Sequence, residues 1–163
     1  MTKLPKLSVP KTILERLHDV ISILILLLSF VYFAVKWAEL PHTIAIHFNG
    51  SGEADGWGSK AILLLLPILS LVIFTLLSLL RKIPHQFNYI AKITEQNALH
   101  HYKNAIILLS WVKLEILLIF SYVQWSVIQN AVGKSIGIGS WLLPIAFLIL
   151  LGTILYYVIK VRK

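Results

Sequence analysis

The stretch that decides the fold is AILLLLPILSLVIFTLLSLL, Ala61–Leu80, which contains no charged side chain. A helix of about 20 apolar residues crosses the roughly 30 Å of hydrocarbon in a bilayer. The run is dominated by Leu and Ile and lacks the alternation of polar and apolar residues seen in membrane barrels, so a helix is favoured. The sequence therefore predicts a transmembrane helix here.

Three further runs of similar character flank it, Val20–Ala38, Ala105–Val127 and Ile136–Ile159. The chain of 163 residues is 58% hydrophobic and 13% charged, with a mean hydropathy of +0.81. Soluble domains carry about 25% charged residues. We therefore expect residues 1–163 to form a single all-α integral membrane domain with four transmembrane helices.

Basic residues concentrate in three segments outside these spans. They are Lys3, Lys6, Lys11 and Arg16 near the start, Arg81, Lys82, Lys92 and Lys103 in the middle, and Lys160, Arg162 and Lys163 at the end. The positive-inside rule predicts that both termini and the 81–104 connection are cytoplasmic and that the loop 39–60 is outside. The net charge of +8 then reflects topology and attraction to anionic lipids, so the expected partner is the lipid bilayer and nucleic acid is excluded.

Apolar residues recur at helical spacing just before and into the first span, at Ile13, Leu14, Leu17, Val20 and Leu24, whereas Lys11, Glu15 and Arg16 fall elsewhere. This pattern is typical of a helix that lies along a membrane surface. We therefore expect a short amphipathic N-terminal helix that anchors the chain at the inner face.

The loop between the first two spans is PHTIAIHFNGSGEADGWGSK, Pro41–Lys60. Thr43–Phe48 is rich in β-branched residues and predicts an extended segment, and the glycines that follow favour turns. The loop can therefore fold back on itself. The side chains that this fold would bring together are His47, Asn49 and Asp55, and Lys60 is expected to pair with a carboxylate.

Known site motifs do not fit this loop. Asn49, Ser51, Glu53 and Asp55 resemble the start of a calcium loop, but no frame supplies both the required Gly and the closing Glu. His42 and His47 are five positions apart, unlike the paired ligands of zinc sites. Phosphate-binding and hydrolase motifs are missing, and cysteine is absent, which excludes thiolate chemistry. We therefore expect no enzyme activity, catalytic residue, metal or cofactor.

The third span contains two ionisable residues, Lys113 and Glu115. A charge at the centre of a bilayer costs about 2.5–3.5 kcal/mol, so such residues usually face a bundle interior and pair. Two positions apart on a helix, they point about 200° away from each other, which disfavours a direct bridge. Two interpretations stay open, a proton or ion relay centred on Glu115 and a polar clamp that fixes helix packing.

A second polar group lies in the 81–104 connection. Thr94 is expected to cap a helix that runs through Glu95 and Asn97 into the third span. This helix would place four polar residues on one face, Asn97, His100, His101 and Asn104. We favour a solvated face over a binding site, because polar residues near span ends are usually hydrated.

The loop also carries a family pattern, formed by Pro41, Ile44, His47, Phe48, Asn49, Gly52, Asp55 and Lys60. In this pattern the chain resembles a bacterial membrane domain of unknown function that also occurs in the N-terminal part of immunity proteins against the sporulation-delaying killing factor. Part of the 81–104 connection, with Asn88, Thr94, Glu95 and Asn97, resembles short members of that family. The resemblance implies a multi-helix protein of the bacterial plasma membrane, linked to bacteriocin self-protection and signalling.

Two functions therefore stand as alternatives. In the first, a non-enzymatic immunity or envelope-stress protein intercepts a membrane-active peptide at the outer loop, with Glu53 and Asp55 supplying charge and Trp57 an apolar anchor. In the second, a small transporter or an accessory subunit of a membrane complex uses Lys113 and Glu115. Four spans need partner helices to enclose a path. The expected partners are accordingly a membrane-active peptide or a partner membrane protein, with a homo-oligomer left open.

Overall fold

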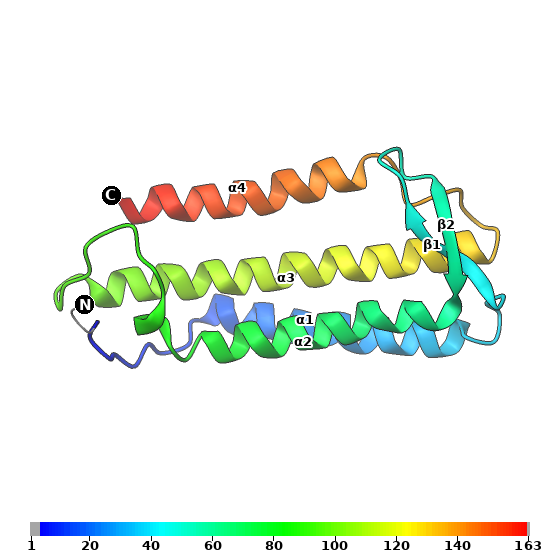
Figure 1. Ribbon diagram of the computed structural model, residues 1–163. Helices are drawn as coiled ribbons and strands as arrows, with labels where there is room; N and C mark the ends of the chain where they lie inside the picture. The colour runs from blue at the N-terminus through cyan, green and yellow to red at the C-terminus, as the bar shows by residue number, and fades with distance from the viewer. Residues whose placement is uncertain (1–3, 163) are drawn as a thin grey trace.

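The chain forms an elongated helical bundle in the computed structural model, which describes residues 4–162 (Figure 1). Lys3 and Lys163, counted above among the basic residues, lie outside the described residues. The long helices are α1 (Ile13–Lys36), α2 (Leu65–Leu80), α3 (Ala98–Ala131) and α4 (Leu142–Arg162). A short 3-10 helix, η1 (Lys60–Leu64), leads directly into α2, and a second, η2 (Pro84–Gln86), follows it.

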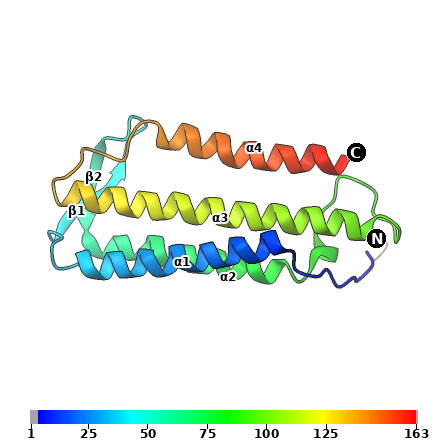
Figure 2. The ribbon, with the colours of Figure 1, turned by 180° about the vertical axis from the view of Figure 1, so that it is seen from behind.

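Each of the four long helical segments in the described part of the chain is long and apolar enough to cross a membrane. The prediction of a multi-pass, mostly helical membrane protein is therefore confirmed. α3 is the central helix and packs against α1, α2 and α4. Both marked chain ends lie at one end of the bundle, which we call the termini end (Figures 1 and 2).

The expected amphipathic N-terminal helix is not seen as a separate element, because α1 runs without a break from Ile13. Its start is fixed by a capping box: the Glu15 N–H donates to the Thr12 hydroxyl at 3.2 Å, and the Thr12 N–H donates to the Glu15 carboxylate at 2.9 Å. Ile13 is 78% exposed, whereas Glu15 is only 3% exposed. The polar side of this first part of α1 therefore faces the bundle, and its apolar side faces outward.

Two span boundaries also differ from those expected. α3 begins at Ala98, well before Ala105, so it carries part of the 81–104 connection. α4 begins at Leu142 rather than Ile136, because Gly137 and Gly139 adopt φ values of 70° and 85°, which end helical geometry. The connection between α3 and α4 is therefore a compact glycine turn.

The loop between α1 and α2 is an antiparallel hairpin of β1 (Thr43–Phe48) and β2 (Ala54–Ser59). The predicted extended segment is confirmed as β1. Two register shifts lie on either side of His47, and such irregularities bend a strand and increase its twist. The hairpin lies across the end of the bundle opposite the two termini (Figures 1 and 2).

Apolar packing is concentrated at the hairpin end. One buried cluster joins the hairpin to the helix ends and to the α3–α4 turn through Phe33, Leu40, Ile44, Leu63, Val127, Ile128, Ile138 and Leu142. A smaller cluster at the termini end packs Val9 onto the start of α3 through Ala98, Tyr102 and Ile106. Between the two clusters the bundle interior contains polar and charged side chains.

Candidate functional site

The tip of the hairpin is closed by the Asn49 side chain. Its Oδ1 accepts hydrogen bonds from the N–H groups of Ser51 and Glu53, each at 3.0 Å. The Asn49 N–H donates to the Glu53 carbonyl at 2.8 Å. Asn favours such turns because its short side chain can replace a backbone acceptor. Asn49 therefore shapes the tip, and its acceptor oxygen is already used within the loop.

Gly52 fastens the tip to the α3–α4 turn. Its φ of +78° favours glycine, and a Cβ at this position would lie 2.7 Å from the carbonyl carbon of Gly139. The Ile138 N–H donates to the Gly52 carbonyl at 2.9 Å. The hairpin is thus joined by backbone contact to the connection between the third and fourth helices.

Lys60 fixes the other end of the hairpin. The expected pairing with a carboxylate is replaced by two bonds to carbonyls, because Nζ donates to Trp37 O at 2.9 Å and to Leu40 O at 3.0 Å. The ammonium also lies 4.4 Å from the centre of the Trp37 ring. A cation at the C-terminus of a helix satisfies carbonyls that lack a helical partner and interacts favourably with the dipole.

The exposed face of the hairpin combines charge with an aromatic ring. His47 Nδ1 lies 2.5 Å from Asp55 Oδ1, which brings this predicted pair together, and both side chains remain exposed. Trp57 is 63% exposed. Because alternate residues of a strand share a face, Asp55 and Trp57 project from the same side of β2. Asn49 and Glu53 bond to each other at the tip instead of joining the His47–Asp55 pair.

A charged network lies between α1, α2 and α3 on the side of the termini. Lys113 Nζ donates to Asp19 Oδ1 at 2.5 Å and to Ser78 Oγ at 3.2 Å. Asp19 also forms an ion pair with Lys11. A cavity of about 310 Å³ adjoins these groups. We call Lys11, Asp19, Ser78 and Lys113 the lysine network.

A second ion pair joins the start of α1 to the end of α2. Arg81 Nε donates to Glu15 Oε1 at 2.7 Å, and another guanidinium nitrogen donates to the Val9 carbonyl at 3.1 Å. Nearby, His18 Nδ1 and Ser110 Oγ are 2.8 Å apart. These contacts, and Asp19 itself, were not predicted from the sequence. The available signal was the spacing of Glu15 and Asp19, which places two carboxylates on one face of a helix.

Glu115 points to the other side of α3, as the two-residue spacing from Lys113 predicts. The Thr153 hydroxyl of α4 donates to Glu115 Oε1 at 2.5 Å. Glu115 is 8% exposed, and its Oε2 is buried and has no hydrogen-bond partner among residues 4–162. A groove of about 430 Å³ runs beside it, lined by Trp111, Gly152 and Tyr156 among others.

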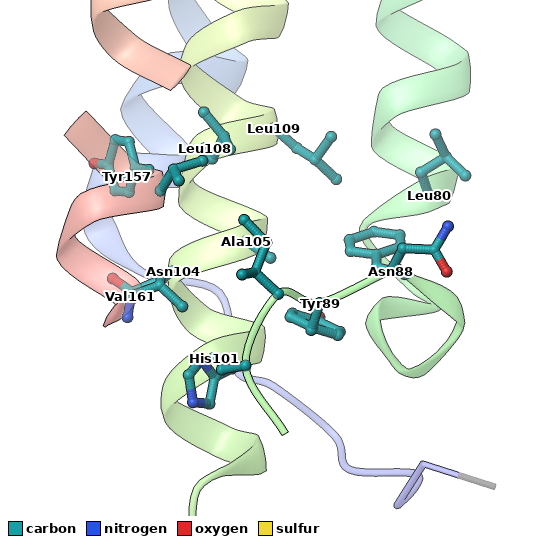
Figure 3. Close-up of a pocket in the computed structure, with 14 residues that line it drawn as sticks. Leu80, Asn88, Tyr89, His101, Asn104, Ala105, Leu108, Leu109, Tyr157 and Val161 are labelled. Carbon is teal, nitrogen blue, oxygen red and sulfur yellow. The ribbon is translucent and has the colours of Figure 1, made fainter. Parts of the chain in front are cut away.

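The motif in the 81–104 connection forms a turn that precedes α3. Thr94 and Asn97 bond reciprocally: the Thr94 N–H donates to Asn97 Oδ1 at 2.8 Å, and the Asn97 N–H donates to Thr94 Oγ1 at 3.3 Å. The Ala98 N–H donates to the Thr94 carbonyl at 2.9 Å, so helical bonding begins at Thr94 as expected, but α3 itself starts only at Ala98. Glu95 lies in the turn before it and is exposed. Asn88 lines an apolar cavity between α2, α3, α4 and the segment 87–91 (Figure 3).

The interpretation of a solvated face is wrong for two of its members. His101 is 6% exposed and Asn104 is equally buried, because the connection folds back over the first turns of α3. Tyr89 from this connection packs on Tyr102, with the ring centres 5.5 Å apart. Burial, and to a lesser degree the neighbouring Tyr102, raise the pKa of the Tyr89 phenol well above its ordinary value.

In the part of the chain that the structure describes, no three His, Asp or Glu side chains gather as a metal site would require. Residues 24–71 match a domain of unknown function, DUF1648. The match spans the second half of α1, the hairpin, η1 and the first part of α2. It contains the five candidate residues of the loop, His47, Asn49, Gly52, Asp55 and Lys60. No curated protein and no solved structure matches the chain.

Proposed function

We propose that this is a non-enzymatic protein of the bacterial plasma membrane whose outer hairpin binds a membrane-active peptide and thereby protects the cell. The observation that carries the proposal is that the hairpin has two groups of residues, one that fixes its structure and one that remains exposed. Asn49, Gly52 and Lys60 are used in internal bonds and close packing. His47, Asp55 and Trp57 remain exposed on the structure thus fixed.

The chemistry of this face suits a cationic, amphipathic peptide. Asp55 supplies an exposed carboxylate, which its contact with His47 Nδ1 at 2.5 Å holds in place. Trp57 supplies a large apolar surface with an N–H donor, and its ring attracts cations. Preorganisation increases affinity because little conformational entropy remains to be lost on binding. The fixed hairpin therefore favours recognition over catalysis.

The placement of this face outside the cell rests on charge. Basic residues flank the spans at the termini end, where Arg81 and Lys82 follow α2 and Lys160 lies in the last turns of α4. The positive-inside rule assigns that end to the cytoplasm. The hairpin, at the opposite end of the bundle (Figure 1), is then extracytoplasmic, where secreted peptides arrive.

The family match supports the same surface. It is centred on the hairpin and excludes Lys113, Glu115 and the 81–104 connection. The resemblance of the hairpin pattern to immunity proteins against the sporulation-delaying killing factor points to bacteriocin immunity or envelope-stress protection as the physiological role.

The test is a deletion strain challenged with a panel of cationic membrane-active peptides. Trp57→Ala and Asp55→Asn should each lower the protective effect of the plasmid-borne gene while leaving membrane levels unchanged. Trp125→Ala is the matched control, because this indole is also exposed but lies on α3 outside the hairpin. Full protection by the Trp57→Ala/Asp55→Asn double variant would refute the proposal.

A second candidate function, as an accessory subunit of a membrane complex, is favoured by Glu115. Its unpartnered Oε2 would be satisfied by a donor on a helix of a partner membrane protein or of a second copy seated in the adjoining groove. Carboxylates within spans usually pair in this way. A carrier role is less favoured, since the apolar cluster around Ile44 and Val127 fills the hairpin end of the bundle.

Photo-crosslinking in living cells separates these candidates. A photoreactive residue at Tyr156, which lines the groove, should capture a membrane protein, and Glu115→Leu should abolish the product. The relay interpretation makes a different prediction, because Glu115→Gln should then change a pH-dependent phenotype. Capture that is insensitive to Glu115→Leu would contradict the accessory role.

A further inference from the structure

A cavity of about 310 Å³ lies beside the lysine network, between α1, α2 and α3 at the termini end. Five ionisable residues line it, Lys11, Glu15, Asp19, Arg81 and Lys113. Its volume falls at the lower end of the range of small-molecule sites. We call it the charged cavity, and it shares none of its lining with the hairpin.

The acidic groups of the charged cavity already have a partner on every oxygen. Glu15 Oε1 accepts from Arg81 Nε at 2.7 Å, and Glu15 Oε2 accepts from the Thr12 N–H at 2.9 Å. Asp19 contacts one lysine of the lysine network through each of its two oxygens. Both carboxylates are therefore neutralised from within the protein, and the cavity offers little to a cation.

The basic groups, by contrast, retain hydrogen-bond donors. Among residues 4–162, the Arg81 guanidinium uses two of its five N–H donors, on Glu15 and on the Val9 carbonyl. In the same part of the chain, the Lys11 ammonium contacts only Asp19 and keeps two further donors. The Arg81 side chain is 22% exposed, and that of Lys11 is 43% exposed. Both groups can therefore donate to a molecule that enters the cavity from outside.

The charges of the lining do not balance. Arg81 pairs with Glu15 at 2.7 Å. Lys113, whose side chain is 5% exposed, pairs with Asp19 at 2.5 Å. The ammonium of Lys11 is then the surplus charge, since the lining has three basic and two acidic residues. A ligand with a single negative charge would neutralise the cavity.

The position of the basic groups points to the membrane as the source of this ligand. Lys11 lies two residues before the start of α1, and Arg81 directly follows the end of α2. The ends of spanning helices lie at the level of the lipid head groups. Farther from these helix ends the lining is apolar, with Ile23, Phe74 and Leu77 among its residues. The cavity therefore suits a molecule whose anionic head group is joined to hydrocarbon.

We propose that the charged cavity binds the phosphate group of an anionic phospholipid, to which Lys11 supplies its uncompensated charge and Arg81 its remaining N–H donors. The phosphodiester of such a lipid carries one negative charge, and a planar guanidinium can donate to two of its oxygens at once. Basic pockets between spanning helices bind anionic head groups in this way. Inorganic phosphate shares this chemistry, so the test includes it. The proposal does not depend on the peptide-binding role of the hairpin.

The test uses the full-length protein in maltoside micelles, which contain no phosphate. Phosphatidylglycerol is titrated into one sample and inorganic phosphate into another, because a ligand that binds the folded state raises the unfolding temperature. Native mass spectrometry counts the lipids that the protein retains. We expect saturable binding of one phosphatidylglycerol molecule, tighter than that of zwitterionic phosphatidylcholine. A saturable rise with inorganic phosphate alone would overturn the lipid as the source, and no saturable binding of either ligand would overturn the site itself.

Two single-lysine variants separate this site from general attraction to the basic end of the bundle. Lys11→Gln removes the surplus charge and should weaken phosphatidylglycerol binding about fivefold, the effect of one partly exposed ion pair. The fold is retained because Asp19 keeps Lys113 as a partner. Lys82→Gln removes the same charge from an exposed residue that follows Arg81 but does not line the cavity, so its binding should equal that of the wild type. Equal affinities of the two variants would contradict the proposal.

A third variant tests the guanidinium. Arg81→Lys keeps a positive charge beside Glu15 but replaces the planar fork of donors with a point charge. We expect weaker phosphatidylglycerol binding with unchanged helical content by circular dichroism. Binding as tight as that of the wild type would show that Arg81 does not hold the phosphate.

Discussion

Removing the charge of Asp19 should destabilise the bundle more than removing its partner Lys113. In the native protein the Lys113 ammonium lies 2.5 Å from Asp19 and 3.2 Å from Ser78. Asp19→Asn leaves the lysine with neutral partners only. Lys113→Leu, by contrast, leaves Asp19 paired with Lys11. The two changes therefore disrupt the same contact but leave different charges behind.

The expected magnitude follows from burial. Breaking a buried ion pair by removing one partner costs about 3–5 kcal/mol, because the other charge remains without compensation. The Asp19 side chain is 18% exposed, and Ser78 still accepts a bond from Lys113, so we expect about 3 kcal/mol for Asp19→Asn. Lys113→Leu should cost about 1 kcal/mol, since an apolar side chain is tolerated in a bundle and Asp19 keeps its second lysine.

The assay is the free energy of unfolding in mixed micelles, measured by titrating SDS and following tryptophan fluorescence. Glu39→Gln is the control, because the Lys36–Glu39 pair is a more exposed ion pair at a helix end and such pairs contribute at most about 1 kcal/mol. A loss for Asp19→Asn no larger than that for Glu39→Gln would refute the reasoning. So would a loss for Lys113→Leu that equals the loss for Asp19→Asn.

Three further outcomes are expected. Gly52→Ala should lower the free energy of unfolding by about 1–3 kcal/mol, because the backbone φ at position 52 is positive. Gly50→Ala should change it little, because no atom lies within 4 Å of the added Cβ. Equal effects of the two changes in the same SDS titration would contradict this reasoning. Because the chain has no cysteine, a single introduced thiol reports its own side of the membrane. Ser51→Cys should react with an impermeant maleimide in intact cells, and Ser8→Cys should react only after permeabilisation. The opposite pattern would reverse the proposed topology. The raised pKa of Tyr89 means that the folded state holds the phenol proton more tightly than the unfolded chain does. The contribution of this phenol to stability is therefore present below about pH 10 and is lost at higher pH. If Tyr89→Phe lost stability at alkaline pH as steeply as the wild type, the phenol would make no such contribution.

The spans could be predicted from sequence because hydropathy acts locally. Ala61–Leu80 has no charge over its whole length, and neither bilayer nor protein offers its backbone an alternative to helical bonding. The extended segment of the hairpin was also evident, because Thr43–Phe48 concentrates β-branched and aromatic residues. These features need no knowledge of distant parts of the chain.

The partners of polar residues could not be predicted in the same way, because they depend on tertiary structure. Lys113 meets Asp19, a residue that precedes the apolar core of the first span and was assigned to a surface helix. Gly52 contacts Gly139, and nothing in either local sequence indicates that contact. The assignment of Lys60 to a carboxylate failed because carbonyls at the end of α1 compete for an ammonium as well as acidic side chains do.

The inward polar side of α1 also bears on the biogenesis of the protein. Asp19 has Lys11 as a partner within its own segment, so the first helix can leave the ribosome and insert with this charge neutralised. Lys113 emerges much later and finds its counter-ion in a helix that is already in the membrane. The pair between the first and third helices can therefore form only where α1 brings Asp19 to the level of Lys113. Without Asp19, Lys113 would keep only neutral partners such as Ser78 inside the bundle, and an unpaired charge within a span is costly.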